Sequence, residues 1–405
     1  MASLLRDRVD IPVLAAVLGL VPLGLVSIYS ATFDAKMSEL FFKQLAAAGI
    51  GAVAMIAAAV TPLRTLQRIS LPTYFLAVLM LVIVLLIGKQ VSGSTSWFQI
   101  GPFSLQPAEF AKIATVLALA VYLSRGDIDL SLRKHLLITS LIVLVPVVLI
   151  LRQPDLGTAL VFFGMLLPVL YWGGASLFMI VALVGPGVVA ITALIGATPF
   201  FVSVLVLGIL LWVTKRNMIA AAVVFSMLVL LGTSVQSIHS KLRPYQQKRI
   251  ETFLDPSADP LGAGYNVLQS KIAIGSGGFF GKGYLQGTQT QLNFIPAQWT
   301  DFIFCVPGEE FGFIAAVVIL VLFSLLLYGG VRIASSVKNS FASFTAIGLT
   351  GIFATHMFMN IGMAMGLTPV VGIPLPFLSY GGSALVANML MAGVLLNLYA
   401  HRKEY

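Results

Sequence analysis

The sequence predicts an all-α polytopic membrane protein, and three observations support that fold class. Of the 405 residues, 59% are hydrophobic. Only 10% are charged, whereas a soluble domain uses about 25% charged residues to cover its surface. About twelve apolar stretches follow one another along the chain, each close to the roughly 20 residues that a helix needs to cross a bilayer. Soluble, disordered, collagen-like and coiled-coil chains are therefore excluded.

The predicted spans leave little of the chain for any other structure. In order, they cover about 11–31, 45–60, 71–88, 108–123, 136–151, 156–172, 177–196, 200–213, 218–232, 302–329, 341–365 and 384–399. Twelve helices of about 20 residues need about 240 positions. We therefore expect a single integral membrane domain over residues 1–405, with no soluble domain.

Basic residues predict how these spans are oriented. With a cytoplasmic N-terminus, thirteen Lys and Arg residues of the termini and short loops lie inside and four lie outside. Because short cytoplasmic loops are rich in Lys and Arg, we expect both termini in the cytoplasm. The first span is too long for a cleaved signal peptide, so it is interpreted as an uncleaved anchor. The net charge of +9 is then explained by inner loops facing anionic lipid, not by nucleic acid, and it also suits an anionic lipid substrate.

Cysteine and histidine offer little for a metal or redox site. Cys305 is the only cysteine, so it has no partner for an internal disulfide or a paired zinc site. The four histidines have no His-Glu-x-x-His spacing, and each is interpreted as structural. They are His135, His239, His356 and His401.

A long polar segment at about 235–300 is predicted to be a large outer loop. Irregular polar backbone must lie outside the bilayer or line a cavity enclosed by protein, and a loop of this length without secondary structure is usually functional. The alternative is a mobile surface loop. A phosphate-loop interpretation of residues 275–283 fails, because Ser276 stands where Gly is needed and Gly283 where Ser or Thr is needed.

Asp301 lies where this loop re-enters the membrane, and it is the best candidate for a catalytic residue. Partial desolvation raises the pKa of a carboxyl group and makes it a better general base near neutral pH. The alternative is that Asp301 caps the next helix. Glu309 and Glu310 follow about two turns later in the same predicted span, so at least one of them is expected to face a cavity or a cation.

Charged and polar residues at the start of another span form a second candidate group. Glu109 and Lys112 are three residues apart, so they share one helix face and are expected to pair. Lys112 could instead offer its ammonium group to a phosphate, and a purely structural pair is the other alternative. Trp97 and Gln106 lie just upstream in an outer loop, where Trp97 alone would be interpreted as an interfacial anchor.

Two further outer segments complete the set of candidates. Asp155 is expected to cap the helix that follows it. Residues 367–383 carry no charge and contain several Pro and Gly residues. Such a segment predicts a re-entrant or cavity-lining turn.

Taken together, six motifs resemble the SEDS family (shape, elongation, division and sporulation). They are QPAEFAK at 106–112, QPDLGT at 153–158, DPSADPLGAGY at 255–265, TDFIF at 300–304, GEEFG at 308–312 and PLPFLSYGGS at 374–383. The segment GTQTQLNFIP at 287–296 is more similar to the elongation branch, and Val371 stands where division-type members often carry Lys. The resemblance implies a bundle of ten core spans with a large extracellular loop before the Asp301 helix.

The same resemblance implies a peptidoglycan glycosyltransferase that polymerises lipid II on the outer face of the bacterial cytoplasmic membrane and releases undecaprenyl pyrophosphate. It implies a class B penicillin-binding protein as transpeptidase partner, together with elongation-complex membrane proteins. Asp301 matches the family's essential carboxylate, and we predict that it deprotonates the acceptor hydroxyl group. The predicted substrate-binding residues are Trp97, Gln106, Glu109, Lys112, Asp155, Lys271, Lys282, Gln289, Gln291 and Ser379.

The positive charge that the leaving pyrophosphate needs has two predicted sources. One is a lysine, namely Lys112, Lys271 or Lys282. The other is a divalent cation, Mg²⁺ or Mn²⁺, and the sequence identifies no ligands for it.

Two departures from the family pattern limit what the resemblance implies. The family usually has Arg before the outer-loop Trp, whereas Ser96 precedes Trp97 here. The chain has about twelve predicted spans instead of ten. Residues 200–234 are the surplus, as an inserted transmembrane hairpin or, in the interpretation that we prefer, as an irregular, reoriented helix pair without catalytic meaning.

Two rival functions remain open from the sequence. A lipid II flippase or other transporter would use the same polar cavity as a passage, and a non-catalytic scaffold would only recruit the transpeptidase. Substitution of Asp301 separates them, because a polymerase loses glycan synthesis, a transporter loses flipping and a scaffold loses neither.

Overall fold

The computed structural model describes residues 9–33, 37–91, 93–101, 103–214, 217–239, 247, 263–296 and 298–403. Several predictions fall outside these residues. They concern the first eight residues of the DPSADPLGAGY motif and the basic residues Arg6, Arg8, Lys36, Lys215, Arg216, Lys241, Arg243, Lys248 and Arg249.

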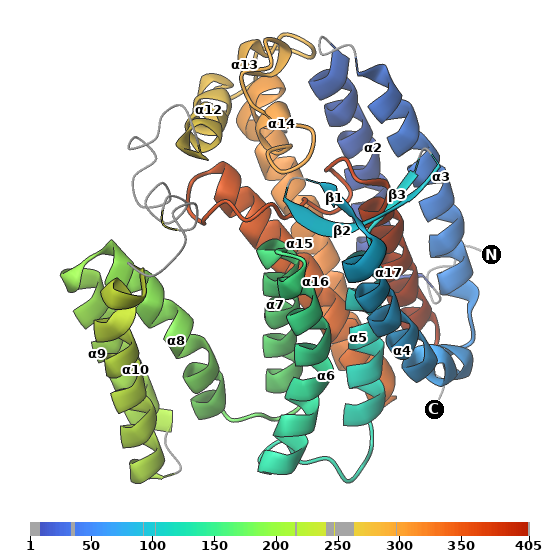
Figure 1. Cartoon of the computed structure of the whole chain (residues 1–405). Coiled ribbons are helices and arrows are strands. Elements are labelled where there is room, and N and C mark those ends of the chain that lie inside the picture. Colours follow the sequence, from blue (N-terminus) through green and yellow to red (C-terminus); the bar gives the residue numbers. More distant parts are fainter. Residues whose placement is uncertain are drawn as a thin grey trace.

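Helices dominate the described chain (Figure 1). The N-terminal half contains α2 (Ile11–Phe33), α3 (Ser38–Val60), α4 (Leu63–Ile87), α5 (Pro107–Leu123), α6 (Arg133–Arg152), α7 (Leu156–Trp172) and α8 (Leu177–Ile195). The C-terminal half contains α9 (Ala197–Thr214), α10 (Met218–His239), α12 (Ala263–Ser276), α13 (Thr288–Gln291), α14 (Cys305–Glu310), α15 (Gly312–Ser336), α16 (Ser340–Ala364) and α17 (Gly382–Ala400).

Ten of the described helices are long and apolar enough to cross a membrane, namely α2, α3, α4, α6, α8, α9, α10, α15, α16 and α17. Two more, α5 and α7, have 17 residues each and pack within the same bundle. The chain is therefore a multi-pass membrane protein with an all-α bundle, as the sequence predicts.

The main bundle has α16 and α17 at its centre, where 67% and 72% of the apolar windows are buried. Around them pack α2, α3, α5, α7 and α15. Small residues allow this close contact, since lipid gives helices little hydrophobic drive to associate. At Gly393 of α17, a Cβ atom would lie 2.3 Å from the carbonyl oxygen of Met55 in α3, so only glycine fits there.

Helices α8, α9 and α10 form a separate cluster beside the main bundle (Figure 1, left). Their own small core consists of Val181, Val189, Val204, Leu207, Leu211 and Leu228. The hairpin predicted at 200–234 corresponds to α9 and α10. Helix α8 packs mainly with α9 and α10, and less with α7. The sequence did not predict this arrangement.

The opposite ends of the bundle differ in character. At one end, Arg332 near the end of α15 pairs with buried Asp10 before α2 and stacks on Tyr399 of α17. At the other end, a three-stranded antiparallel sheet lies between α4 and α5, in the order β1 (Lys89–Val91), β2 (Ser94–Ile100) and β3 (Phe103–Leu105). Helices α12, α13 and α14 lie at this same end (Figure 1, top).

Two predictions about the long outer loop and the next span were wrong. The described part of the loop is not structureless, because α12 buries Val267, Ser270 and Ala273 against its neighbours. The span predicted at 302–329 is broken, because Gly312, the first residue of α15, adopts a left-handed φ of 69°. A Cβ atom on Gly312 would lie 2.4 Å from the backbone nitrogen of Gly281. Glu309 and Glu310 thus lie in a short helix of their own, not in the membrane-crossing helix.

Candidate active site

Asp301 lies half-buried in the turn that joins the outer loop to α14. Three consecutive carbonyl oxygens of this turn each accept one hydrogen bond. Trp299 accepts from the Tyr380 backbone N–H at 2.8 Å, Thr300 from Ser379 Oγ at 2.6 Å, and Asp301 from Asn360 Nδ2 at 2.8 Å. The backbone that carries the carboxylate is therefore held in one conformation.

Two of these donors belong to residues 371–381, which we call the strap. The strap lies within residues 367–383, the segment for which the sequence predicted a re-entrant or cavity-lining turn, and it runs beside the Asp301 carboxylate. A Cβ atom on Gly372 would lie 3.4 Å from Asp301 Oδ2, and Gly372 has a φ of 70°. A glycine here lets the backbone both turn and stay close to the carboxylate.

The strap is fixed from two sides. Gln44 of α3 donates to the Ser379 carbonyl at 3.2 Å and accepts from the Gly381 N–H at 3.0 Å. Gly24 of α2 packs directly on the backbone of Phe377, where a Cβ atom would lie 2.2 Å from the carbonyl oxygen. Ser379 thus serves the backbone of the site, and its Oγ also accepts from the Leu375 N–H at 2.8 Å.

Asp155 and Gln106 lie next to the strap. Asp155 caps α7 by accepting from the backbone N–H of Thr158 at 2.9 Å, which confirms the predicted cap. Its second oxygen accepts from Gln106 Nε2 at 3.1 Å. Gly157, in the first turn of the same helix, packs against the carbonyl of Val371 in the strap.

Burial, together with the nearby negative charge of Asp155, raises the pKa of Asp301 to about 6. A carboxyl group with this pKa is mostly ionised at neutral pH yet takes up a proton more readily than an exposed one. The capping alternative does not hold, because the N-cap of α14 is Phe304, without a side-chain cap bond.

Glu109 and Lys112 form the predicted pair, with 2.9 Å between Oε1 and Nζ. Lys112 is only 1% exposed, and its Nζ also lies 2.8 Å from Nε2 of His356. The ammonium group is therefore enclosed by protein and not open to a phosphate in this structure.

Glu309 and Glu310 anchor the end of the outer loop. Glu309 pairs with Lys282 at 2.7 Å and accepts from the backbone N–H groups of Gln289 and Thr290, so the prediction that one of the glutamates faces a cation is confirmed. Burial would raise the pKa of Glu309, but the hydrogen bonds from Lys282, Gln289 and Thr290 outweigh it and lower the pKa overall.

Glu310 shows the opposite balance. It accepts from Ser30 of α2 and from Gln291 Nε2. Burial still raises the pKa of Glu310 above its ordinary value. Lys282, Gln289 and Gln291 therefore belong to this anchor, which joins α13, α14 and α2.

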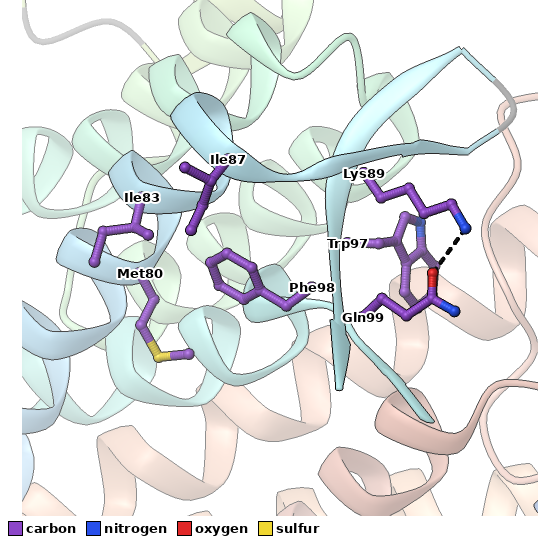
Figure 2. Close-up of a pocket in the computed structure, with 7 residues that line it drawn as sticks. All are labelled: Met80, Ile83, Ile87, Lys89, Trp97, Phe98 and Gln99. Atoms are coloured by element: carbon purple, nitrogen blue, oxygen red, sulfur yellow. Dashed lines mark hydrogen bonds between the residues drawn. The ribbon is translucent and has the colours of Figure 1, made fainter. Parts of the chain in front are cut away.

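A groove of about 520 Å³ lies between α4 and β2 (Figure 2). Side chains alternate along β2, so Phe98 faces α4 while Trp97 and Gln99 point to the other side of the strand. The apolar part is lined by Met80, Ile83, Ile87 and Phe98. On the other side, Lys89 donates to Gln99 at 2.7 Å.

Of the predicted lysines, Lys271 is the exposed one that the described contacts leave without a hydrogen bond or ion pair. It lies on α12 over the Gly366 turn, where its Nζ is 3.8 Å from the position of a Cβ atom on Gly366. Among the described residues, no group of three or more His, Cys, Asp or Glu side chains is arranged to hold a metal ion.

The structure therefore brings Gln106, Asp155, Asp301 and Ser379 together around the strap, with Glu109 and Lys112 behind it. Sequence reasoning missed Gln44, His356 and Asn360. A usable signal existed for the last two, because His356 and Asn360 are polar, four residues apart and therefore on one face of a mostly apolar helix.

Comparisons with known proteins agree along the whole chain. The sequence model of the cell cycle protein family FtsW/RodA/SpoVE matches residues 11–202 and 192–404. Peptidoglycan glycosyltransferase MrdB of Escherichia coli strain K12 is 36% identical over 399 residues, covering 98% of this chain and 95% of MrdB. Peptidoglycan glycosyltransferase RodA of Treponema pallidum is 34% identical over 427 residues, covering 97% and 98%.

Solved structures give the same result. One chain of a peptidoglycan synthase complex that coordinates polymerization and crosslinking superposes with a TM-score of 0.76 at 29% identity, covering 98% of this chain and 99% of that one. Rod shape determining protein RodA of Thermus thermophilus superposes with a TM-score of 0.63 at 26% identity, covering 98% of each chain.

Proposed function

Because the chain belongs to the FtsW/RodA/SpoVE family of cell cycle proteins and is a peptidoglycan glycosyltransferase, we propose that Asp301 is the general base of its glycosyl transfer. The observation that carries this proposal is the Asp301 carboxylate itself. It is half-buried, has a pKa raised to about 6, and sits on a backbone whose three carbonyls are all bonded.

The substrate is lipid II, and the reaction joins two lipid II molecules. Asp301 accepts the proton of the 4-hydroxyl group of one GlcNAc while that oxygen forms a bond to the anomeric carbon of the MurNAc of the other molecule. The bond from this carbon to the pyrophosphate oxygen breaks, and undecaprenyl pyrophosphate leaves with the electron pair. The product strand is one disaccharide longer, and Asp301 returns its proton to solvent.

Lys271 is the best-placed lysine to attract the leaving pyrophosphate. Lys112 and Lys282 are already paired with Glu109 and Glu309, whereas the ammonium group of Lys271 is exposed at the same end as the strap. Charge that meets developing negative charge on the leaving group stabilises the transition state.

A divalent cation could assist Lys271 when substrate is bound. Mg²⁺ is commonly held by one or two carboxylates together with phosphate oxygens and water. Asp155 could supply such a carboxylate, although its oxygens already accept from Thr158 and Gln106. The cation would add charge at the pyrophosphate.

The groove between α4 and β2 suits the isoprenoid chain of a lipid II molecule. Met80, Ile83, Ile87 and Phe98 offer a continuous apolar wall at the sheet end of the bundle. That end carries Asp301, whereas Arg332, Arg125 and Arg133 lie at the opposite end. The excess of basic residues there supports a cytoplasmic location for both termini and an active site on the outer face.

The enzyme works beside a transpeptidase. The likeness to a chain of a peptidoglycan synthase complex supports a class B penicillin-binding protein as partner, together with other membrane proteins of the elongation complex.

The test is polymerisation of labelled lipid II in proteoliposomes, read as glycan strands on a gel. Asp301→Asn should abolish strand formation while lipid II binding persists, because the amide keeps the shape but accepts no proton. Asp127→Asn is the matched control, since Asp127 is exposed at the opposite end, and it should leave polymerisation unchanged. Strands of normal length from Asp301→Asn would overturn the proposal, and a loss of lipid II flipping instead would favour a transporter.

A further inference from the structure

A continuous chain of buried polar groups runs behind the strap. Lys112 of α5 bonds to Glu109 at 2.9 Å and lies 2.8 Å from Nε2 of His356 on α16. The other ring nitrogen, Nδ1, lies 2.9 Å from the carbonyl oxygen of Pro374 in the strap. His356 is 2% exposed, and the proposed reaction gives it no role.

Only one form of the histidine satisfies both neighbours. An ammonium group donates and never accepts, so Nε2 must be the acceptor for Lys112. A carbonyl oxygen only accepts, so Nδ1 must carry the proton and donate to Pro374. His356 is thus neutral, and its tautomer is set by the two groups that it joins.

His356 and Asn360 act on neighbouring residues of the strap from one face of α16. Asn360 Nδ2 donates to the carbonyl of Ile373 at 2.7 Å, and His356 donates to the carbonyl of Pro374. Pro374 has no N–H of its own to hold it. These two bonds therefore fix the backbone directly after Gly372, the residue that packs against the Asp301 carboxylate.

We propose that His356 is a positioning residue for glycosyl transfer, which couples the Glu109–Lys112 pair to the strap backbone that walls the Asp301 carboxylate. The inference rests on the proposed role of Asp301. The Glu109–Lys112 pair then has a function although it does not touch substrate. Lys112 orients the imidazole ring of His356, and this ring holds the strap.

Three substitutions test the two hydrogen bonds of His356 separately. His356→Asn keeps an amide near the position of Nδ1, His356→Gln keeps a polar atom near the position of Nε2, and His356→Leu keeps neither. A small displacement of a catalytic group can reduce a rate by up to about 100-fold. We expect His356→Leu to lower kcat at least about tenfold with KM within about twofold, and the two amides to fall between it and the unchanged protein.

The pH–rate profile shows whether His356 positions the strap or only supports the folded structure. A loosened strap admits water to Asp301, so the acidic limb of the profile should move to lower pH in His356→Leu and less in the amide variants. A purely structural role would reduce the amount of folded protein without moving that limb. His135→Leu is the control, since His135 bonds to Tyr122 at the opposite end of α5, and it should change neither kcat nor the limb.

The measurements use full-length protein in proteoliposomes. Each variant is taken from its monodisperse elution peak, and equal amounts are reconstituted. An unchanged kcat or an unmoved acidic limb in folded His356→Leu would overturn the inference, and if that variant does not fold, His356→Gln decides by the same criteria. Asp301→Asn is measured in parallel. If it still polymerises, the proposed function is wrong. If Asp301→Asn is inactive while the His356 variants behave like the unchanged protein, only the positioning role of His356 is wrong.

Discussion

Burial makes the Asp301 carboxylate a better base, and it also lowers the stability of the folded protein when that carboxylate is charged. Since the base must be ionised to accept a proton, polymerisation should fall as the pH drops through the raised pKa, with half of the plateau rate near pH 6. The measurement is the initial rate of strand formation between pH 5 and pH 8. An acidic limb near pH 4 would mean that the carboxylate is more hydrated than the structure indicates.

The same raised pKa predicts that Asp301→Asn is more stable than the unchanged protein. A carboxyl group whose folded pKa lies above its unfolded value favours folding below the unfolded pKa, and this contribution is lost as the pH rises from 3.8 to about 6. About two pKa units correspond to at most about 3 kcal/mol at pH 7. The thermal midpoint in detergent should therefore rise in Asp301→Asn at pH 7.

The control for that prediction is the same comparison of thermal midpoints at a lower pH. At pH 4 most of the Asp301 carboxyl is protonated in the folded protein, so the difference between the two thermal midpoints should largely disappear. An equal gain at both values of pH would show that the amide stabilises through packing and not through removal of a buried charge.

At the residue scale, the sequence predicts what depends on near neighbours and misses what depends on distant ones. The cap formed by Asp155 and the pair of Glu109 and Lys112 involve residues three apart, so spacing was enough. His356 meets Lys112 across 244 positions of sequence, and its other partner is a backbone carbonyl. The spacing of His356 and Asn360 marks a polar helix face, but a single sequence does not indicate the distant partners that this face contacts.

At the scale of elements, Glu309 determines whether the end of the outer loop stays docked. Glu309→Gln would point an amide N–H₂ group at backbone donors of α13 and remove the charge that pairs with Lys282. We expect a loss of about 2 kcal/mol or more in stability, with faster proteolysis and hydrogen exchange over residues 282–296. Because the pKa of Glu309 is lowered, the difference should narrow as the pH falls below the ordinary value of 4.5.

A second ion pair provides the control for Glu309. Glu39 and Lys43 are 3.4 Å apart on the exposed side of α3, where Glu39 is 85% exposed. Exposed pairs contribute little, so Glu39→Gln should leave both the thermal midpoint and the exchange of residues 282–296 unchanged. An equal effect of both substitutions would contradict the anchoring role of Glu309.

The contact between α2 and the strap predicts a strong effect of one methyl group. In Gly24→Ala, the new Cβ atom would lie 2.2 Å from the carbonyl oxygen of Phe377 and 2.8 Å from the Cα of Leu378. Backbone atoms cannot rotate away, so the strap must shift, and kcat should fall about tenfold or more. The measurement is polymerisation at matched protein amounts.

Gly49→Ala is the matched control for Gly24→Ala. Gly49 lies in α3, and a Cβ atom there meets nothing within 4 Å. Alanine favours a helix over glycine by up to about 1 kcal/mol, so this variant should be as active as the unchanged protein and slightly more stable. Equal loss in both variants would show that the close contact at Gly24 does not position the strap.

Helix lengths were predictable because bilayer thickness fixes them, and this explains why the apolar stretches fall close to the observed helices. The break before α15 was not predicted, although Glu309 and Glu310 precede Gly312, because the contact that requires a turn at Gly312 is made by Gly281, which is distant in the sequence. What interrupts the helix is the turn at Gly281 pressing on Gly312. Helix α12 was missed because its buried face is short and partly polar, with Ser270 among its buried residues.

At the scale of the whole molecule, the site uses the main bundle and not the cluster of α8, α9 and α10. The residues placed around Asp301 and the strap come from α2, α3, α16, the turn before α14 and the N-terminal ends of α5 and α7. The core of the smaller cluster is separate. Its apolar outer faces meet lipid, so contacts within it are expected to contribute little to the main bundle.

This separation predicts that α9 and α10 can be removed without loss of activity. Phe200 and Gly232 are adjacent in space, since a Cβ atom on Gly232 would lie 2.1 Å from the Phe200 ring. A short Gly-Ser linker in place of residues 200–232 can therefore join the outer end of α8 to the remaining chain, and removal of two spans preserves the orientation of all later helices. Strand formation from labelled lipid II should stay within about twofold of the unchanged protein, because no side chain of the site is altered. If the deletion protein inserts, elutes as a single species and yet makes no strands, α9 and α10 belong to the catalytic machinery, and the hairpin is more than an insertion.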